Sequence, residues 1–256
     1  MQNQNPESIW FGAAKVTPQE KTDKVIGVFD RVAARYDLMN DLMSGGIHRI
    51  WKDRFVRMIH PQAFKGGRPL HYLDVAGGTG DIAFRIRKKA GSGAVITLCD
   101  LNENMLTVGR NRAIDRGWLN DFQWVTGNAE SLPVPDSSVD VYTIAFGLRN
   151  VTHIDTALAE AFRVLRPGGR FYCLEFSHVQ PEGLNHLYAL YSDMVIPRLG
   201  ARVAQDEDSY RYLVESIRKF PSQQKLLCRL RDAGFKMAEY NNLSAGIAAV
   251  HRGVHP

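Results

Sequence analysis

A glycine-rich turn at residues 73–81 has the residue types that are best suited to binding a ligand. An apolar run containing Asp74 is followed by Gly78, Thr79 and Gly80, after which a helix-period segment begins. Glycines let the chain turn tightly and let a ligand approach the main chain, while a helix start offers free N–H donors to a carboxylate or phosphate. We therefore expect a ligand to lie on Asp74, Gly78, Thr79 and Gly80. A glycine turn that binds nothing is the alternative.

A second residue that could bind a ligand, Asp100, ends the next apolar run. A carboxylate at this place can accept hydrogen bonds from the hydroxyls of a ribose. The structural alternative is an N-cap of the following helix, which Asn102 could provide instead. Residues 78–83 also fit the G-x-G-x-x-G/A pattern, so a nicotinamide-dependent oxidoreductase stays open at this point.

The elements that must position these residues alternate as in a parallel α/β sheet. Five strands are expected at 70–76, 94–100, 121–127, 138–145 and 170–176. Helices are expected at 81–89, 103–115, 154–165 and 222–233. Two further strands, 235–241 and 246–251, are joined by so few residues that they must pair antiparallel.

The remaining segments frame this sheet within a single domain, 1–256. Residues 1–65 are expected to form a helical extension, because Val28 and Phe29 share one helical face and residues 47–59 carry another apolar stripe. Residues 178–220 are too long for an ordinary connection after the fifth strand and predict an inserted helical lid.

Composition narrows the class of protein. The chain has 256 residues, 45% of them hydrophobic, with no transmembrane-length apolar run and no signal-peptide pattern at its start. Its three cysteines lack paired spacing, which favours a reducing cytoplasm over secretion. The net charge of +5 is spread along the chain and does not indicate nucleic-acid binding.

Three further motifs separate the candidate cofactors. Residues 127–133, 146–150 and 165–169 follow or precede expected strands, and together they resemble class I methyltransferases. This resemblance implies S-adenosyl-L-methionine as cofactor and a doubly wound, Rossmann-like sheet of seven strands with the last strand antiparallel. The terminal hairpin inferred above from loop length agrees with that topology.

The resemblance sharpens at residues 36–44, 46–49, 146–151 and 209–217, which are similar to the UbiE-type C-methyltransferases of ubiquinone and menaquinone biosynthesis. The likeness extends over residues 11–253. It implies transfer of a methyl group to the ring of a polyprenylated quinol, either 2-polyprenyl-6-methoxy-1,4-benzoquinol or demethylmenaquinol or both, with S-adenosyl-L-homocysteine as product. No metal is implied, and the sequence shows no Cys or His cluster with ligand spacing.

By the same resemblance, Thr79, Asp100, Asn128 and Ala129 bind the cofactor. Thr79 would face the methionine carboxylate and Asp100 the ribose, while the Asn128 amide and the Ala129 backbone suit the adenine edge. Some family members have serine where this chain has Ala145, so only a backbone contact is expected there.

Carbon methylation needs an electron-rich ring, a group that stabilises a phenolate and a base that removes the ring proton. Arg149 suits the role of stabilising the negative charge of the phenolate, and Asn150 could orient the quinol oxygen. An arginine is a poor base, so a water or one of His48, His153, Asp37 and Glu175 is the candidate. His48 could equally be a structural histidine. Tyr36, with Asp37 and Asn40, could close over the cofactor as a flap or serve as ordinary capping residues.

Other functions remain open from the sequence: another small-molecule methyltransferase, a nicotinamide oxidoreductase, or a structural component of a quinone-biosynthesis complex. The expected partner is the quinol. A peripheral membrane contact at the inner face of the cell membrane, a biosynthetic complex and a homodimer stay open. The segments 47–59 and 187–199 would provide the membrane contact unless they pack on the domain.

Overall fold

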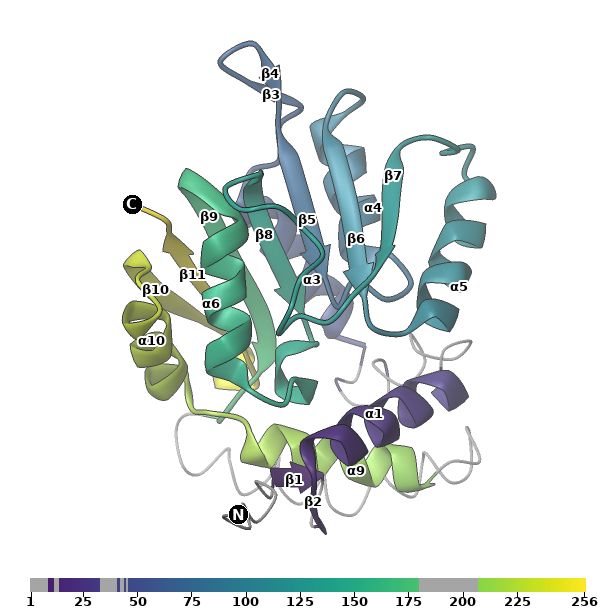
Figure 1. Ribbon diagram of the computed structural model, residues 1–256, viewed down its shortest axis with the longest axis vertical. Coiled ribbons are helices and arrows are strands. Elements are labelled where there is room, and N and C mark those ends of the chain that lie inside the picture. Colours follow the sequence, from purple (N-terminus) through teal and green to yellow (C-terminus); the bar gives the residue numbers. More distant parts are fainter. Residues whose placement is uncertain (1–8, 12–13, 33–40, 42–43, 45, 180–206) are drawn as a thin grey trace, which may run out of the picture.

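The computed structural model describes residues 9–11, 14–32, 41, 44, 46–179 and 207–256 (Figure 1). The expected residues Tyr36, Asp37 and Asn40 lie outside this part of the chain, as does most of the segment 178–220. The end of that segment forms α9, Glu207–Lys219. No helix formed by the described residues combines the length and the apolarity needed to cross a bilayer.

A seven-stranded sheet is the centre of the fold, with the strand order β10-β11-β9-β8-β5-β6-β7. The pairings of β5 with β6 and β8, of β6 with β7 and of β8 with β9 are parallel, whereas β11 is antiparallel to both of its neighbours. The expected topology is therefore confirmed. The strands are β5 His71–Val75, β6 Val95–Asp100, β7 Phe122–Thr126, β8 Val139–Ala145, β9 Leu165–Phe176, β10 Lys236–Leu243 and β11 Ala248–Val254.

The strand β9 begins earlier than the sequence predicted. It starts at Leu165, which pairs with Val139, and the register then shifts so that Arg170 pairs with Val141. The glycines that precede Arg170 are thus an irregularity within the strand, and Gly168 has a φ of 76°. The apolar pattern starts only after this irregularity, which is why the prediction started at residue 170.

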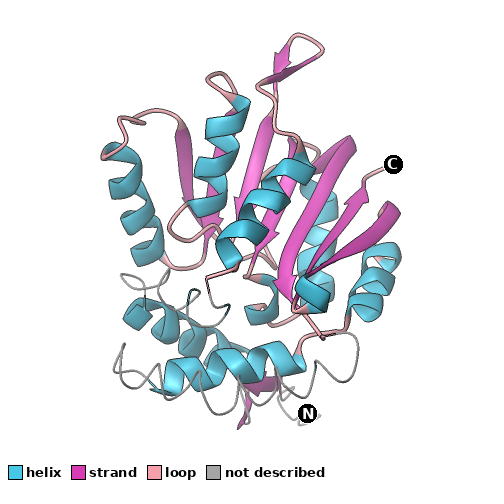
Figure 2. Cartoon of the chain, turned by 180° about the vertical axis from the view of Figure 1, so that it is seen from behind, coloured by secondary structure: helices cyan, strands magenta, loops and turns pink. Residues whose placement is uncertain are grey.

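Helices cover both faces of the sheet (Figures 1 and 2). One hydrophobic cluster packs α3, α4 and α5 against the face that carries Tyr72, and a second packs α6 and α10 against the face that carries Leu73. Adjacent residues of β5 point to opposite faces, as the pleat requires. The helices are α3 His48–Ile59, α4 Asp81–Ala90, α5 Glu103–Ile114, α6 Ile154–Val164 and α10 Gln223–Asp232.

The helices α1, Pro18–Val32, and α9 lie across the end of the sheet where the parallel strands finish (Figure 1). Lys21 of α1 donates from Nζ to the Val151 carbonyl at 2.8 Å, and Asp30 accepts from the side-chain amides of Asn102 and Asn104 at 2.8 Å. The hairpin of β1, Ile9–Phe11, and β2, Ala14–Val16, adds Phe11, which stacks on a tyrosine of α9. The helix α1 is thus tied to the sheet at both of its ends. Two small elements lie elsewhere in the structure. One is the hairpin of β3, Phe64–Lys65, with β4, Arg68–Pro69, and the other is the short helix η5, Ser244–Gly246.

Candidate functional site

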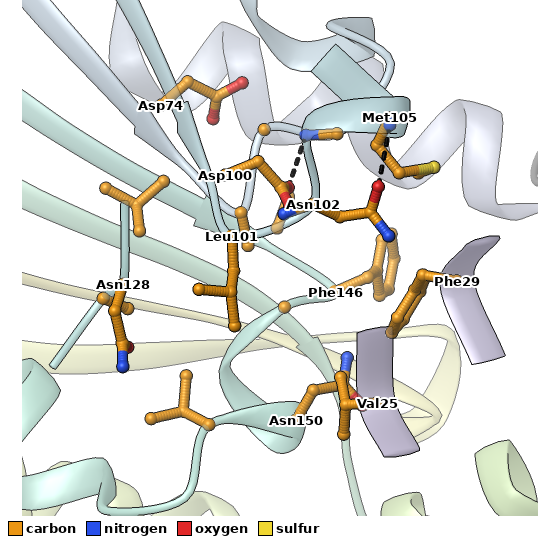
Figure 3. A pocket seen from close by; sticks show the side chains of 18 of the residues that line it. Val25, Phe29, Asp74, Asp100, Leu101, Asn102, Met105, Asn128, Phe146 and Asn150 are labelled. Atoms are coloured by element: carbon orange, nitrogen blue, oxygen red, sulfur yellow. Dashed lines mark hydrogen bonds between the residues drawn. The ribbon is translucent and has the colours of Figure 1, made fainter. Parts of the chain in front are cut away.

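One cavity lies between α1 and the carboxyl ends of β5, β6, β7 and β8. Figure 3 shows Asp74, Asp100 and Asn128 on the sheet side, with Val25 and Phe29 of α1 opposite them. In an open parallel sheet, ligands bind at the carboxyl ends of strands where the order reverses. Here β6 and β7 follow β5 on one side, and the chain then crosses to β8 on the other side of β5. The strand order therefore reverses at β5, whose carboxyl end lines the cavity.

The glycine turn has the left-handed backbone that its sequence predicts. Ala76, Gly78 and Gly80 have φ values of 50°, 51° and 85°, and Gly80 N donates to Gly77 O at 2.9 Å. Gly78 and Thr79 line the cavity, as expected. Gly80 does not appear in the lining, and a Cβ there would lie 2.8 Å from the Phe84 ring. Its glycine is therefore required for packing under the turn.

Asp100 reaches the cavity from the end of β6. Its Oδ2 accepts from Gly78 N and its Oδ1 from Asn102 N, both at 2.8 Å (Figure 3). Burial raises the pKa of this carboxyl to about 6, against the effect of these backbone donors. The N-cap of α5 is Asn102, whose Oδ1 accepts from Met105 N at 3.0 Å. The expectation that Asn102 could replace Asp100 as the cap is confirmed.

Asp74 is an almost completely buried acid in the cavity wall. Its Oδ1 accepts from the Thr143 hydroxyl at 2.7 Å. Its Oδ2 has no hydrogen-bond partner of normal geometry among the described residues, although the backbone N–H of Ala83 favours the ionised carboxyl. Burial raises the pKa of Asp74 to about 7. This oxygen is itself buried, so Asp74 supports the wall of the cavity and does not present an open acceptor to it.

The loops after β7 and β8 form the third side of the cavity. Asn128, Ala129 and Ala145 all line it, as the sequence predicted. Glu130 joins the two loops, because its Oε1 accepts from the backbone N–H of Thr152 at 2.9 Å and from that of the next residue at 3.1 Å. These two bonds hold the loops together.

The loop after β8 is compressed against the glycine turn. Phe146 has a φ of 56°, and a Cβ on Gly147 would lie 2.4 Å from the Ala76 Cβ. The short helix η2, Leu148–Asn150, follows and brings Asn150 into the lining. The Tyr212 hydroxyl donates to Asn150 Oδ1 at 3.1 Å, which leaves the amide nitrogen as the group that can donate into the cavity (Figure 3). Burial raises the pKa of Tyr212, so its proton stays available for this bond.

Arg149 lies behind the wall of the cavity and does not appear in its lining. Its guanidinium is fully buried and donates from Nη1 to Glu175 Oε1 at 2.7 Å and to Phe146 O at 2.5 Å. Its backbone N–H also donates to Glu175 Oε2 at 3.2 Å. The pair therefore stabilises the loop that carries Asn150. Direct contact of Arg149 with a quinol oxygen remains a prediction, and the proton-acceptor role considered for Glu175 gains no support from this burial.

His48 is likewise buried outside the lining of the cavity. Its Nε2 lies 2.8 Å from Asp41 Oδ1, and burial together with nearby Lys52 lowers its pKa. These contacts fit the structural alternative, and a catalytic role for His48 stays a prediction. His153 precedes α6 and is also absent from the lining.

Several lining residues were not predicted from the sequence. They come from segments far from the glycine turn in the chain, and only their burial on amphipathic helices could have suggested them. They are Thr22, Val25, Ile26, Phe29, Lys52 and Met105.

The sequence model of the ubiE/COQ5 methyltransferase family matches residues 17–255. The ubiquinone/menaquinone biosynthesis C-methyltransferase UbiE of Bradyrhizobium diazoefficiens is 54% identical over 96% of this chain and 97% of its own length. The protein of the same name from Rhodopseudomonas palustris is 52% identical over 98% of both chains.

Solved structures show the same fold at low sequence identity. A SAM-dependent methyltransferase from Aquifex aeolicus aligns with a TM-score of 0.58 and 15% identity, over 80% of this chain and 89% of its own. The [4+2]-cyclase SpnF aligns with a TM-score of 0.66 and 17% identity, over 92% and 97%. A cyclase among these structures shows that the fold does not by itself determine the reaction.

Proposed function

Because this chain belongs to the ubiE/COQ5 methyltransferase family, we propose that it transfers a methyl group from S-adenosylmethionine to a ring carbon of a polyprenylated quinol. The observation that carries the proposal is that one cavity joins the glycine turn and Asp100 with Asn150. The first two suit a nucleoside cofactor, and the third offers a hydrogen-bond donor to an acceptor. The relatives' shared name supports a benzoquinol or a naphthoquinol as acceptor.

The residues present fit this cofactor. Gly78 leaves the main chain open to a ligand, Asp100 can accept from ribose hydroxyls, and Asn128 with Ala129 can face a purine. When bound, the cofactor supplies an electrophilic methyl group on a sulfonium.

For the acceptor, the protein has to hold an electron-rich ring and stabilise negative charge on its oxygen. The Asn150 amide N–H, oriented by Tyr212, donates to that oxygen in this proposal. Arg149 acts through Asn150, because its bonds to Glu175 and Phe146 O fix the loop from behind. Proton removal from the ring carbon then uses a water or an acidic group, and we do not assign it to His48.

The polyprenyl tail of the substrate determines where the protein can bind it. Such a tail is too apolar to move freely through water, so we propose that the protein acts from the cytoplasm at the surface of the membrane. The apolar face of α3 is buried, since Trp51 and Phe55 pack in the core, but Ile47 and Ile50 are 40% and 63% exposed. Arg54 and Arg57 lie exposed on the same helix and support contact with anionic lipid.

The other partners considered from the sequence, a biosynthetic complex and a second copy of the chain, stay proposals. A nicotinamide cofactor is not supported by the family to which the chain belongs.

The direct test is turnover with the two redox forms of one acceptor. Purified protein, S-adenosylmethionine and a demethylated quinol should yield S-adenosylhomocysteine, whereas the oxidised quinone should not, because its ring is electron-poor. Equal turnover of both forms would argue against an activated quinol ring. No turnover of either form would argue against the proposed acceptor, and a rise in melting temperature with NADH alone would overturn the cofactor.

A further inference from the structure

A buried lysine lines the cavity and is not accounted for by the expected cofactor residues. Lys52 projects from α3, is 3% exposed, and donates from Nζ to Asp81 Oδ2 at 2.7 Å. Its Nζ also lies 6.0 Å from the centroid of the Phe146 ring. Buried ammonium groups are rare and need compensating partners, so the position of this one calls for an explanation.

The charged side chains around the cavity are mainly acidic. Among the described residues that line the cavity, Lys52 is the one cation. Its partner Asp81 also pairs through Oδ1 with Arg85. Arg85 has a second carboxylate partner, Asp53, whose Oδ1 lies 3.1 Å from Arg85 Nε. Four acidic residues line the same cavity: Asp74, Asp81, Asp100 and Glu130.

The cofactor carries the complementary charges. S-adenosylmethionine has a sulfonium, an ammonium and one carboxylate, and the first two suit a cavity rich in acids. Its carboxylate would be repelled by those acids unless it lies against a positive group. The lining offers that group at Lys52, which is bonded to the first residue of α4.

The start of α4 adds a second attraction for an anion. The N-cap is Gly80, which has no side chain to bond the first N–H groups of the helix. The Ala83 N–H of this first turn favours the Asp74 carboxylate, and the helix dipole favours a further negative charge at this end. The ammonium of Lys52 is held at the same end of α4 by its bond to Asp81.

We propose that Lys52 binds the carboxylate of the cofactor's methionyl group and so sets the position of the methyl group in the cavity. This assignment rests on the proposed function, since it requires that S-adenosylmethionine is the ligand. It makes Lys52 a determinant of cofactor choice, because a nucleoside without a carboxylate gains nothing from it.

Calorimetry with two ligands tests the assignment. Wild-type protein and Lys52→Met are titrated with S-adenosylhomocysteine and with its decarboxylated analogue, which differ only in the carboxylate. Lys52→Met should weaken S-adenosylhomocysteine binding by roughly 10- to 100-fold, the range for a lost charged hydrogen bond. Binding of the decarboxylated analogue should change by about twofold at most, within the usual additivity error.

Arg85→Met is the matched control, because it removes the other cation from Asp81 without touching the lining. It should preserve the affinities of both ligands. Equal losses for the two ligands in Lys52→Met, or no loss for S-adenosylhomocysteine, would overturn the assignment. If Lys52→Met does not fold by circular dichroism, the neutral Lys52→Gln takes its place, with the same outcomes. Failure of the wild-type protein to bind either ligand would instead contradict the proposed function.

Discussion

At the scale of single residues, the account depends on a few buried polar groups whose partners are defined. Asp100 and Asp74 are the clearest, since burial raises the pKa of both into the range where enzymes work. Asp100 has two backbone donors, whereas Asp74 keeps one oxygen without a partner of normal geometry among the described residues. Asp100 is held in place by these backbone donors, and the second oxygen of Asp74 is itself buried.

We predict that cofactor affinity depends on the ionisation of Asp100. The ionised carboxylate accepts from ribose hydroxyls, so the ligand favours the form that exists above its pKa of about 6. Asp100→Asn should weaken S-adenosylhomocysteine binding by about 1–3 kcal/mol at about pH 8, with a smaller difference from wild type near pH 5. Asp74 titrates in the same range, and its pKa, raised by burial, is raised further by Asp100, so the ratio of the two proteins' affinities is compared across the whole range. A ratio that is constant across this range in calorimetry would remove Asp100 from the ribose site.

Arg149 gives a second prediction at this scale. Arg149→Lys keeps the charge but cannot donate to Glu175 and to Phe146 O with one planar group. The loop with Asn150 should shift, which lowers kcat by roughly 10- to 100-fold while the affinity for S-adenosylhomocysteine changes little. Glu175→Gln should act in the same direction and cost about 3–5 kcal/mol of unfolding free energy, because a buried charge loses its partner. Wild-type turnover in Arg149→Lys would refute the positioning role.

At the scale of elements, the cavity depends on the close approach of two loops. The turn after β5 and the loop after β8 meet at Ala76 and Gly147, and Ala76 has a φ of 50°, which is unusual for a residue other than glycine. The sequence predicted the parallel strands because each is an apolar run bounded by turn residues. It predicted the glycine turn because few other residues permit its φ angles.

The same signals could not predict which distant helix covers the cavity. The helix α1 lies over it through Lys21, Asp30 and Phe29, and these contacts depend on the tertiary arrangement. Lys52 is a similar case, since an amphipathic pattern shows that α3 packs on the domain but not that one of its lysines ends in a cavity. The contact of Arg149 with Glu175 joins residues that the motifs place in separate elements.

Gly147→Ala tests the contact between the loops. Gly147 has a φ of −114°, which alanine tolerates, so any effect is steric. We expect a loss of about 1–3 kcal/mol in unfolding free energy and weaker cofactor binding, because the added methyl group would separate the two loops. Gly27→Ala, in the middle of α1, is the control and should be neutral or stabilising, because a Cβ there would meet only Arg31 Nη1, at an ordinary contact distance of 3.8 Å. Similar melting temperatures and affinities for both variants would contradict the compressed arrangement.

At the scale of the whole molecule, the question is how a protein that binds a nucleoside cofactor meets a polyprenylated acceptor. The cavity lies under α1, at the carboxyl ends of the parallel strands. Both α1 and α9 lie at that end of the sheet (Figure 1). The segment 180–206, which includes the apolar stretch considered for membrane contact, lies outside the described residues. The surface that can be assigned is therefore the exposed side of α3.

We predict that the protein floats with anionic liposomes and that binding declines with salt, because Arg54 and Arg57 are exposed beside Ile50. Arg54→Glu with Arg57→Glu should reduce flotation without a change in melting temperature. Arg110→Glu on α5, with Arg116→Glu in the turn after it, makes the same change in net charge at exposed positions and serves as the control. No liposome binding at low salt would leave a partner protein to present the quinol.

The central claim is methyl transfer to a ring carbon, and locating the transferred methyl group tests it most directly. Protein, a reduced demethyl-quinol and S-adenosylmethionine with a ¹³C-labelled methyl group are incubated, and the product is examined by nuclear magnetic resonance. The account predicts one new methyl resonance in the range of a carbon-bound aromatic methyl group, with loss of one ring proton. A label in the methoxy range would show transfer to oxygen and would contradict the account.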